Sequence, residues 1–317
     1  MNAQVNSTMT AVVVDSSDRR RLVLKEVARP QPSTTEMLVR VQAISLNRGE
    51  TRMALKEATD GWRPGWDVAG IVEQPAADGP ATGTRVVCTA SSAGWAEFIA
   101  VPPASAATIP DNVSCEQAAS LPVAALTARR ALQLAGPLKG RNVLISGASG
   151  GVGTFALQLA HLQEARVVGA IRSKAQEALV RRLGADEVGL GDNLAGAATF
   201  GPYDLILESV GGQSLAAALS MLAPGGVCVL LGASAGSNTT FDAAKFRVGG
   251  TSLYGLVMGF EFRREPPGVG LGELVRLVAE QKLRPEITVT GHIGEIAEVA
   301  AKLLERGFVG KAVLKVP

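Results

Sequence analysis

The stretch Val143–Thr154, VLISGASGGVGT, decides how this sequence is expected to fold. Its apolar start, together with the residues around it from Asn142 to Ser146, predicts a buried strand, and the strand runs into a corner that holds four glycines. After the corner, Val152–Leu162 has apolar residues at a spacing typical of a helix buried on most of its sides. Such a corner leaves the first amide N–H groups of the helix unpaired, and with the helix dipole they favour an anion, most often a phosphate.

The spacing over Ala148–Gly153, ASGGVG, matches the dinucleotide-binding fingerprint G-x-G-x-x-G with alanine at its first position. The match by itself also fits an ordinary tight turn between a strand and a helix. Its position after a strand and before a helix favours the nucleotide interpretation. We therefore predict that the corner binds a cofactor through Ser149, Gly150, Gly151 and Val152.

The end of the next predicted strand, Val167–Ile171, indicates which dinucleotide is bound. NAD enzymes usually carry an acidic residue there, which accepts hydrogen bonds from the ribose hydroxyl. Here the strand is followed by Arg172, Ser173 and Lys174. Because a guanidinium pairs bidentately with a phosphate and a serine hydroxyl donates to it, this corner predicts NADPH rather than NADH. The alternative is a solvated basic helix start.

Composition narrows the class of protein. A chain of 317 residues is long enough for two domains, and its net charge of +2 gives no electrostatic reason to expect a nucleic-acid partner. It has no apolar run of ~18 residues and no signal-peptide pattern, so we expect no membrane association and a cytoplasmic location.

Cys88, Cys115 and Cys228 are odd in number and far apart, which excludes a disulfide framework and a four-cysteine zinc site. Cys228 is predicted to lie in the core of a strand.

The order of elements predicts two kinds of domain. From Thr10 to about Pro110, short β-type runs separated by turn residues are typical of a small irregular barrel. Ser114 and Gln117 form a capping-box pattern at the start of a helix, which Pro122 should interrupt or end. After Asn142, strands and helices alternate as in a parallel doubly wound sheet. We expect strands at 143–146, 166–171, 204–208, 227–232, 251–257 and 310–316, helices at 152–163, 174–183, 213–222, 271–283 and 293–307, and a loop at 265–272.

Motifs along nearly the whole chain carry a family resemblance. In order they are SLNRGE, GWDVAGIV, GWAEFIAVP, LPVAALTARRAL, GASGGVG, LGADEV, LILESVGG, GGVCVLLGAS and GKAVL. The chain resembles the medium-chain dehydrogenase/reductase superfamily, in its zinc-free quinone oxidoreductase-like branch, which includes zeta-crystallin-like and enoyl reductase-like proteins. The resemblance implies an α/β fold: a GroES-like irregular β-barrel over residues 1–122, a Rossmann NADPH-binding domain with a doubly wound parallel sheet over 123–260, and a segment over 261–317 that returns to the barrel. It also implies an active site in the cleft between the domains.

The resemblance bears on metal binding as well. Zinc-dependent members carry cysteine and histidine ligands, but here the first ligand position falls within ISLNRGE (44–50), which has no cysteine. Trp66 replaces the histidine of the Gly-His-Glu motif, and the four-cysteine lobe is missing. An indole offers only an N–H donor and cannot bind zinc, so we predict no metal ligands. Without a Lewis acid, the expected chemistry is hydride delivery to an acceptor activated by conjugation.

Site residues follow from the resemblance position by position. Asn47 matches an asparagine near the nicotinamide ribose and is the one predicted catalytic residue, although an Asx turn is an equally good interpretation of the sequence. Thr127 matches a threonine that faces the nicotinamide. The predicted cofactor residues at the ends of two further strands are Ser209, Val210 and Gly211, and Gly232, Ala233 and Ser234.

Two positions depart from the family pattern. Arg52 stands where many members have a tyrosine, and Phe308 stands where an asparagine is common. An arginine cannot give up a proton, although it could hold an enolate or an acidic substrate; the alternative is a solvated loop residue. The proton donor and the exact acceptor therefore stay open.

The sequence thus predicts an NADPH-dependent, zinc-independent reductase of a quinone or of the C=C bond of an enone. Two alternatives stay open: an enoyl-thioester reductase of fatty-acid or polyketide metabolism, and a non-catalytic, crystallin-like NADPH-binding protein. The unguarded apolar strand within 249–259 predicts a homodimer that pairs this edge with its own copy. The alternative is that the loop at 265–272 folds back over the strand.

Overall fold

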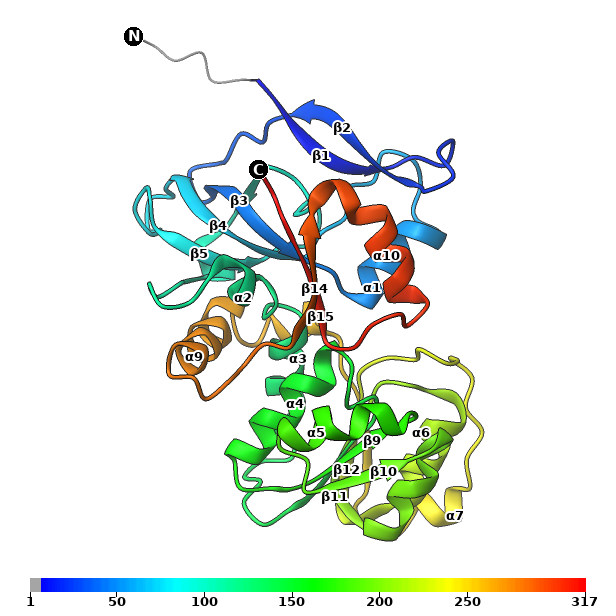
Figure 1. Ribbon diagram of the computed structural model, residues 1–317. Coiled ribbons are helices and arrows are strands. Elements are labelled where there is room, and N and C mark those ends of the chain that lie inside the picture. Colours follow the sequence, from blue (N-terminus) through cyan, green and yellow to red (C-terminus); the bar gives the residue numbers. More distant parts are fainter. Residues whose placement is uncertain (1–6) are drawn as a thin grey trace. The chain divides into compact units, whose positions relative to one another are not determined.

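The computed structural model describes residues 7–317, which divide into two compact units (Figure 1). The first unit takes in the chain up to Leu126 together with Phe262–Pro317. The second unit is the continuous segment Thr127–Glu261. In sequence, the second unit is therefore an insertion into the first.

A seven-stranded sheet forms most of the first unit. Its strand order is β14-β15-β3-β4-β5-β7, with β6 paired to β3, and β1 and β2 form a separate antiparallel pair. Only the β14–β15 pairing is parallel among the strand pairs described for this unit. The strands are β1 (Thr8–Val14), β2 (Leu22–Ala28), β3 (Met37–Ser45), β4 (Asp67–Gln74), β5 (Arg85–Thr89), β6 (Phe98–Val101), β7 (Ala106–Thr108), β14 (Ile287–His292) and β15 (Lys311–Lys315). The helices are α1 (Arg48–Arg52), which continues as a π-helical turn (Met53–Glu57), α2 (Cys115–Ala119), α9 (Pro267–Ala279) and α10 (Ile296–Leu304), while α3 (Ala124–Gln133) crosses the boundary between the units.

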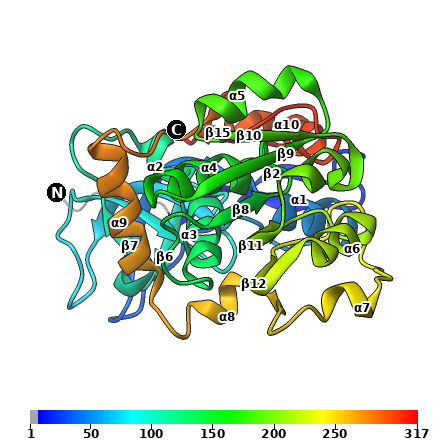
Figure 2. The same ribbon diagram turned by 90° about the horizontal axis from the view of Figure 1, so that it is seen from below.

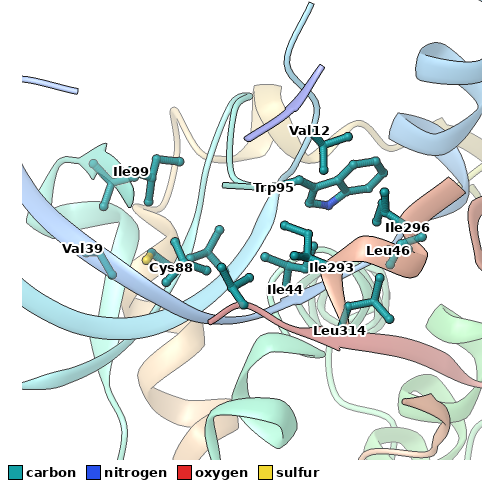
Figure 3. Packing of buried hydrophobic residues seen from close by; sticks show 14 of the residues in the cluster. Val12, Val39, Ile44, Leu46, Cys88, Trp95, Ile99, Ile293, Ile296 and Leu314 are labelled. Atoms are coloured by element: carbon teal, nitrogen blue, oxygen red, sulfur yellow. The ribbon is translucent and has the colours of Figure 1, made fainter. Parts of the chain in front are cut away.

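Apolar residues from distant parts of the chain fill the core of the first unit. Figure 3 shows part of this cluster, with Trp95, Ile44 from β3, Leu314 from β15 and Ile296 from α10. Trp95 and Leu314 have no exposed surface. The core is therefore complete only when the segment after the second unit has returned to the barrel strands.

The predicted irregular β-rich region and the capping box are confirmed in the first unit. Ser114 begins α2, with Gln117 as its capping partner, and Pro122 lies in the break between α2 and α3. The patterns do not predict β2, β7 or β14. β2 (LVLKEVA) has one buried residue and turns polar after three apolar ones, β14 (ITVTGH) has no buried residue, and β7 has three residues, so none of them has the longer buried apolar run of the core strands.

The predicted loop at 265–272 is wrong, because α9 begins at Pro267. Proline is accepted in the first turn of a helix, where its missing N–H needs no partner. A glycine in the first turn of α9 has a role in packing. A Cβ on Gly268 would lie 2.5 Å from the carbonyl oxygen of Ala106, so glycine allows α9 to pack closely against β7.

Six parallel strands form the sheet of the second unit, in the order β10-β9-β8-β11-β12-β13. Figure 2 shows β9, β8, β11 and β12 side by side. The strands are β8 (Asn142–Ile145), β9 (Arg166–Ile171), β10 (Glu187–Leu190), β11 (Tyr203–Glu208), β12 (Leu222–Leu230) and β13 (Ser252–Gly255). The helices are α4 (Gly151–Leu162), α5 (Glu177–Arg182), α6 (Gly212–Ser220), α7 (Ala243–Phe246) and α8 (Met258–Glu261), with 3-10 turns at Lys174–Gln176 and Asp192–Phe200.

The predicted doubly wound sheet is confirmed, and α4 is buried over most of its length, as its apolar spacing indicates. Cys228 lies fully buried in β12, where burial raises the pKa of its thiol to about 12. The four-residue edge strand β10 was too short to predict from periodicity. No helix within residues 7–317 is long and apolar enough to cross a membrane.

Candidate functional site

The carboxyl ends of the parallel strands bring most of the predicted cofactor residues to one edge of the second unit. The strand order runs outward in both directions from the neighbours β8 and β11. Ligands of open parallel sheets bind outside the carboxyl ends of the strands at such a reversal. The candidate site therefore begins where β8 and β11 end.

The glycine corner after β8 has the backbone that the fingerprint requires. Gly147 has a φ of +58°, and Gly150 is the N-cap of α4. A Cβ on Gly153 would lie 2.4 Å from the carbonyl oxygen of Gly147, so only glycine allows the helix to start this close to the turn. The structure places the predicted residues at this corner, and none of them is buried: Ser149, Gly150, Gly151 and Val152.

The basic corner lies at the end of the neighbouring strand β9. Arg172, Ser173 and Lys174 follow this strand directly, and all three are exposed. Ser173 begins a short 3-10 turn, and its hydroxyl oxygen accepts from the Ala175 N–H at 3.4 Å. Within residues 7–317, the side chains of Arg172 and Lys174 have no hydrogen-bond or ion-pair partner. Both cations are thus available to an anionic ligand.

Hydrogen bonds fix the residues that follow β11. The Ser209 N–H donates to Ser146 Oγ at 2.8 Å, which ties the ends of β11 and β8 together. The Glu208 carboxylate accepts from the Gly211 N–H at 2.7 Å and from the Val210 N–H at 3.1 Å. The predicted residues Ser209, Val210 and Gly211 therefore have a defined backbone path beside the glycine corner.

The predicted residues after β12 adjoin this path. The Ser234 N–H donates to the carbonyl oxygen of Ser209 at 3.3 Å, and Gly232 and Ala233 lead up to it from the strand. A Cβ on Gly232 would lie 3.4 Å from that same carbonyl oxygen. The structure thus brings the ends of β8, β9, β11 and β12 together at one edge.

The two remaining predicted residues lie elsewhere. Thr127 is buried in α3, at the first position of the second unit. Asn47 belongs to the first unit, where it is the N-cap of α1.

Asn47 is part of a buried polar group that we call the Asn47 cluster: Asn47, Glu50, Asp67 and Lys311. Lys311 Nζ donates to Asn47 Oδ1 at 2.6 Å and to Asp67 Oδ2 at 3.2 Å. Glu50 Oε1 accepts from the backbone N–H of Asn47 at 2.9 Å and from its Nδ2 at 3.0 Å. The cluster joins α1, β4 and β15, three elements far apart in the sequence.

The charges of the Asn47 cluster are shielded from water. Glu50 and Asp67 have no exposed surface, and Lys311 is 2% exposed. Burial raises the pKa of the Glu50 carboxyl well above its usual range, and the charge of Asp67 raises it further. Burial also raises the pKa of Asp67, against the opposing effect of the Lys311 ammonium. Of the two carboxyls, Asp67 is the one with a cation in direct contact.

The positions that depart from the family pattern lie in the first unit. Arg52 ends α1, is 60% exposed and forms an ion pair with Glu57 at 3.3 Å. Phe308 is partly buried against the barrel core. The ring of Trp66 lies against Gly49, whose added Cβ would be 3.1 Å from it.

A β-rich unit interrupted in sequence by a parallel-sheet unit with a glycine turn after its first strand is an arrangement found in two-domain proteins that bind dinucleotides. Two family models match the chain: "Alcohol dehydrogenase GroES-like domain" over residues 33–111 and "Zinc-binding dehydrogenase" over residues 151–271. The chain belongs to the medium-chain dehydrogenase/reductase superfamily, in its zinc-free quinone oxidoreductase-like branch. The resemblance and the expected GroES-like and Rossmann architecture are thereby confirmed.

Individual relatives include enzymes with different names. The chain is 35% identical over 294 residues to the spectinabilin polyketide synthase system protein NorB of Streptomyces orinoci, covering 89% of this chain but 13% of that protein. It is 32% identical to the quinone oxidoreductase of Rattus norvegicus, covering 65% of this chain and 67% of the relative, and 27% identical to the acryloyl-coenzyme A reductase of Metallosphaera sedula, covering 96% and 99%. A solved structure of the mycobacterial protein Rv1454c complexed with NADPH matches with a TM-score of 0.87 at 26% identity, covering 97% of this chain and 99% of that chain.

The two non-protein groups that the superfamily can carry fit this chain differently. A dinucleotide fits, because the glycine corner leaves room for close approach and Arg172 and Lys174 are unpaired beside it. Zinc does not fit, because Trp66 occupies a ligand position and residues 7–317 hold no group of three or more His, Cys, Asp or Glu side chains that could bind a metal.

Glu50, Asp67 and Lys311 are not among the site residues that the sequence predicts. A signal was present, because Asp67 and Lys311 are charged residues next to apolar strand runs, DVAGIV and KAVL. Charges at such positions are rarely buried unless they are paired. Their pairing with each other, however, depends on strand neighbours that periodicity does not reveal.

Proposed function

We propose that this protein is an NADPH-dependent reductase that transfers hydride, without zinc, to a quinone or to the activated C=C bond of an enone. The observation that carries the proposal is the edge where the glycine corner after β8 and the unpaired Arg172 and Lys174 after β9 lie at neighbouring strand ends. Family membership supports hydride chemistry, and the relatives named as quinone oxidoreductases support the acceptor class.

In this proposal each part of the edge has one task. The backbone N–H groups at Gly150, Gly151 and Val152 bind the pyrophosphate, and Arg172 with Ser173 and Lys174 binds the 2′-phosphate. The strand ends at Ser209–Gly211 and Gly232–Ser234 bind the nicotinamide half, and Thr127 faces the ring. NADPH, when bound, supplies the hydride from C4 of its nicotinamide.

Asn47 is the protein group that we assign to the nicotinamide ribose. The chain offers no protein acid to which we assign protonation of the reduced acceptor. Arg52 is exposed and remains charged, so it cannot supply a proton, and solvent is the proposed source.

The acceptor panel below distinguishes two alternatives from this proposal. Relatives named as an acryloyl-coenzyme A reductase and a polyketide synthase system protein favour an enoyl-thioester substrate. A crystallin-like protein that binds NADPH without turnover would keep the same edge and the same unpaired cations. A cytoplasmic location and a homodimer complete the proposal; the dimer is supported by β13 at the sheet edge, where Leu253 is 42% exposed, and by Val257 two residues after the strand, which is 58% exposed.

The test combines cofactor affinity with an acceptor panel. We expect NADPH to bind at least about tenfold more tightly than NADH, because a lost phosphate–guanidinium pair costs more than about 1.4 kcal/mol. Arg172→Ala should weaken NADPH and leave NADH nearly unchanged. Arg166→Ala is the matched control, because Arg166 is exposed at the opposite end of the same strand. Equal affinity of the unmutated protein for both cofactors would refute the cofactor assignment.

NADPH consumption with quinones, simple enones and crotonyl thioesters then separates the functions. Turnover of quinones or enones supports the proposal. Turnover confined to thioesters supports the enoyl-thioester reductase, and tight NADPH binding with no turnover on the whole panel supports the crystallin-like protein.

A further inference from the structure

Arg63 lies in the first unit, in the connection between the π-helical turn at Met53–Glu57 and β4. Its side chain is partly buried and has no hydrogen-bond or ion-pair partner within residues 7–317. Burial lowers the pKa of its guanidinium, and no charged group of the described chain adds to this effect or opposes it. Arginine nevertheless stays charged in proteins. Arg63 is therefore a partly buried cation that the described chain does not neutralise.

Arg63 differs in this respect from the other partly buried arginines of the first unit. Among residues 7–126 and 262–317, each of these has an acceptor within the protein: Arg21, Arg29, Arg40, Arg48 and Arg85. Arg29, for example, pairs with Glu73 at 2.8 Å, and Arg85 donates to the carbonyl oxygen of Val113 at 2.6 Å. A buried charge without such a partner is unfavourable. An acceptor for Arg63 must come from outside the described chain.

The burial of the three nitrogens shows which edge of the guanidinium a ligand can reach. Nε of Arg63 is fully buried without a hydrogen-bond partner. Nη1 and Nη2 also have no acceptor in the described chain, but they are not fully buried and so reach the surface. The edge formed by Nη1 and Nη2 therefore faces outward. Two N–H groups on such an edge can bind two oxygens of one carboxylate or phosphate at the same time.

Hydrogen bonds fix the backbone that carries this side chain. The carbonyl oxygen of Arg63 accepts from the Ala93 N–H at 2.8 Å and from the hydroxyl of Ser92. The next residue, Pro64, restricts the backbone of Arg63 to extended conformations. The carbonyl oxygen of Pro64 accepts in turn from the Trp95 N–H at 3.1 Å. The guanidinium thus projects from a defined backbone position, which reduces the conformational entropy lost when a ligand binds.

We propose that Arg63 is the anion-binding residue of a site on the first unit, and that its ligand presents a carboxylate or a phosphate group. Water can hydrate the two outer nitrogens, but it does not neutralise the charge, whereas an oxyanion does both. The site uses no residue of the second unit. The proposed function assigns no anion to the first unit, so this inference goes beyond it and is tested without NADPH or an acceptor.

Titration with two simple anions tests the site. Trp62 and Trp66 lie close to Arg63 in the sequence, so tryptophan fluorescence is the readout. We expect a saturable response to acetate or to inorganic phosphate at constant ionic strength, and the anion that binds more tightly identifies the group as carboxylate or phosphate. Arg63→Gln should weaken that binding by about tenfold or more, and Arg63→Lys, which keeps the charge without the paired N–H groups, should weaken it less.

The matched control is Arg19→Gln. Arg19 is an exposed arginine of the same unit and has no partner within residues 7–317, so its replacement should leave the affinity unchanged. Equal losses at Arg19 and Arg63 would show general attraction of anions to positive charge and would overturn the site. The absence of a saturable response to either anion would overturn it as well.

Chemical modification locates the bound anion. Phenylglyoxal reacts with accessible guanidinium groups, and peptide mapping identifies the arginines that it has modified. We expect modification of both Arg63 and Arg19, with the anion protecting Arg63 alone. Protection of both arginines to the same extent, or no protection of Arg63, would contradict the assignment.

The stability of the anion-free protein gives an independent test. Arg63→Met removes the charge and keeps an unbranched apolar stem, so in anion-free buffer its melting temperature should equal or exceed that of the unmutated protein. Arg85→Met should lower the melting temperature, because Arg85 has a carbonyl acceptor in the fold. The bound anion should then raise the melting temperature of the unmutated protein but not that of Arg63→Met. A clear loss of stability in anion-free Arg63→Met would show that the guanidinium serves the fold, and would overturn the proposal.

Discussion

Replacement of Glu50 with glutamine should change how the stability of the protein depends on pH. In the unfolded chain a glutamate titrates near pH ~4.3. In the folded protein burial, with the charge of Asp67 added to it, raises the pKa of Glu50 well above that value. Between the two pKa values the folded state therefore binds more protons than the unfolded state, and the free energy of unfolding falls as pH rises.

The size of the effect follows from the proton count. One proton bound in excess by the folded state changes the free energy of unfolding by about 1.4 kcal/mol per pH unit. Below pH ~4.3 both states are protonated and the contribution is fully present; it is lost as pH rises toward the folded pKa. Glutamine does not titrate, so Glu50→Gln should gain about 1.4 kcal/mol on the unmutated protein for each pH unit within this window.

The three tryptophans provide the assay. Trp62, Trp66 and Trp95 all lie in the first unit, so tryptophan fluorescence reports the unfolding of the unit that contains the Asn47 cluster. Urea titrations at several pH values between about 5 and 8 give the free energy of unfolding of each variant.

The control is the same substitution at an exposed carboxylate. Glu57 lies close in sequence and is 49% exposed, so Glu57→Gln removes a carboxylate that is not buried and is the matched control. Parallel stability curves for Glu50→Gln and the unmutated protein would show that Glu50 titrates normally, and would refute the charge argument for the Asn47 cluster.

Three further results are expected. Gly153→Ala should destabilise the second unit by about 1–3 kcal/mol and weaken NADPH binding, because the added methyl would lie 2.4 Å from the carbonyl oxygen of Gly147; thermal melts and a fluorescence titration measure both effects. Leu253→Lys should convert a dimer into monomers in sedimentation, since Leu253 is 42% exposed on the edge strand β13, and an unmutated protein that is already monomeric at micromolar concentration would contradict the dimer. Leu253 is a better choice than Tyr254, whose hydroxyl donates to Glu261 at 2.6 Å within the same unit. Elemental analysis of protein purified without chelator should give well under one equivalent of zinc, and EDTA should leave activity intact; a stoichiometric signal would contradict the ligand argument.

The sequence predicts the second unit better than the first. Regular alternation of buried strands and helices predicts its parallel sheet, and the glycines of 147–153 mark the corner because a side chain at Gly153 has no room. In the first unit, β2 has one buried residue and β14 has none, so neither contains the longer buried apolar run that marks a core strand. The start of α9 is not predicted, because it contains proline and glycine, which are usual in loops. Here the proline lies in the first turn of the helix, and the glycine allows a close approach to a neighbouring strand.

The candidate site also has one part that the sequence predicts and one part that it does not. The fingerprint and the basic corner depend on short segments, so their local sequence is enough to predict them. The Asn47 cluster depends on a bond between Lys311 and Asn47, which are 264 positions apart. Because the sequence does not show which strands lie beside β15, patterns within single segments cannot reveal that these two residues are in contact.

The place of β15 between β14 and β3 affects the order in which the protein can fold during synthesis. The strand at Lys311–Lys315 pairs with Ala43–Ser45, while the whole of Thr127–Glu261 is translated between them. The inserted unit is therefore complete on the ribosome while this part of β3 still has an open edge. We expect the inserted unit to fold first. Until β15 is synthesised, the N-terminal part of the first unit has unpaired strand groups exposed. We expect this stage of synthesis to be the most prone to aggregation and the most dependent on chaperones.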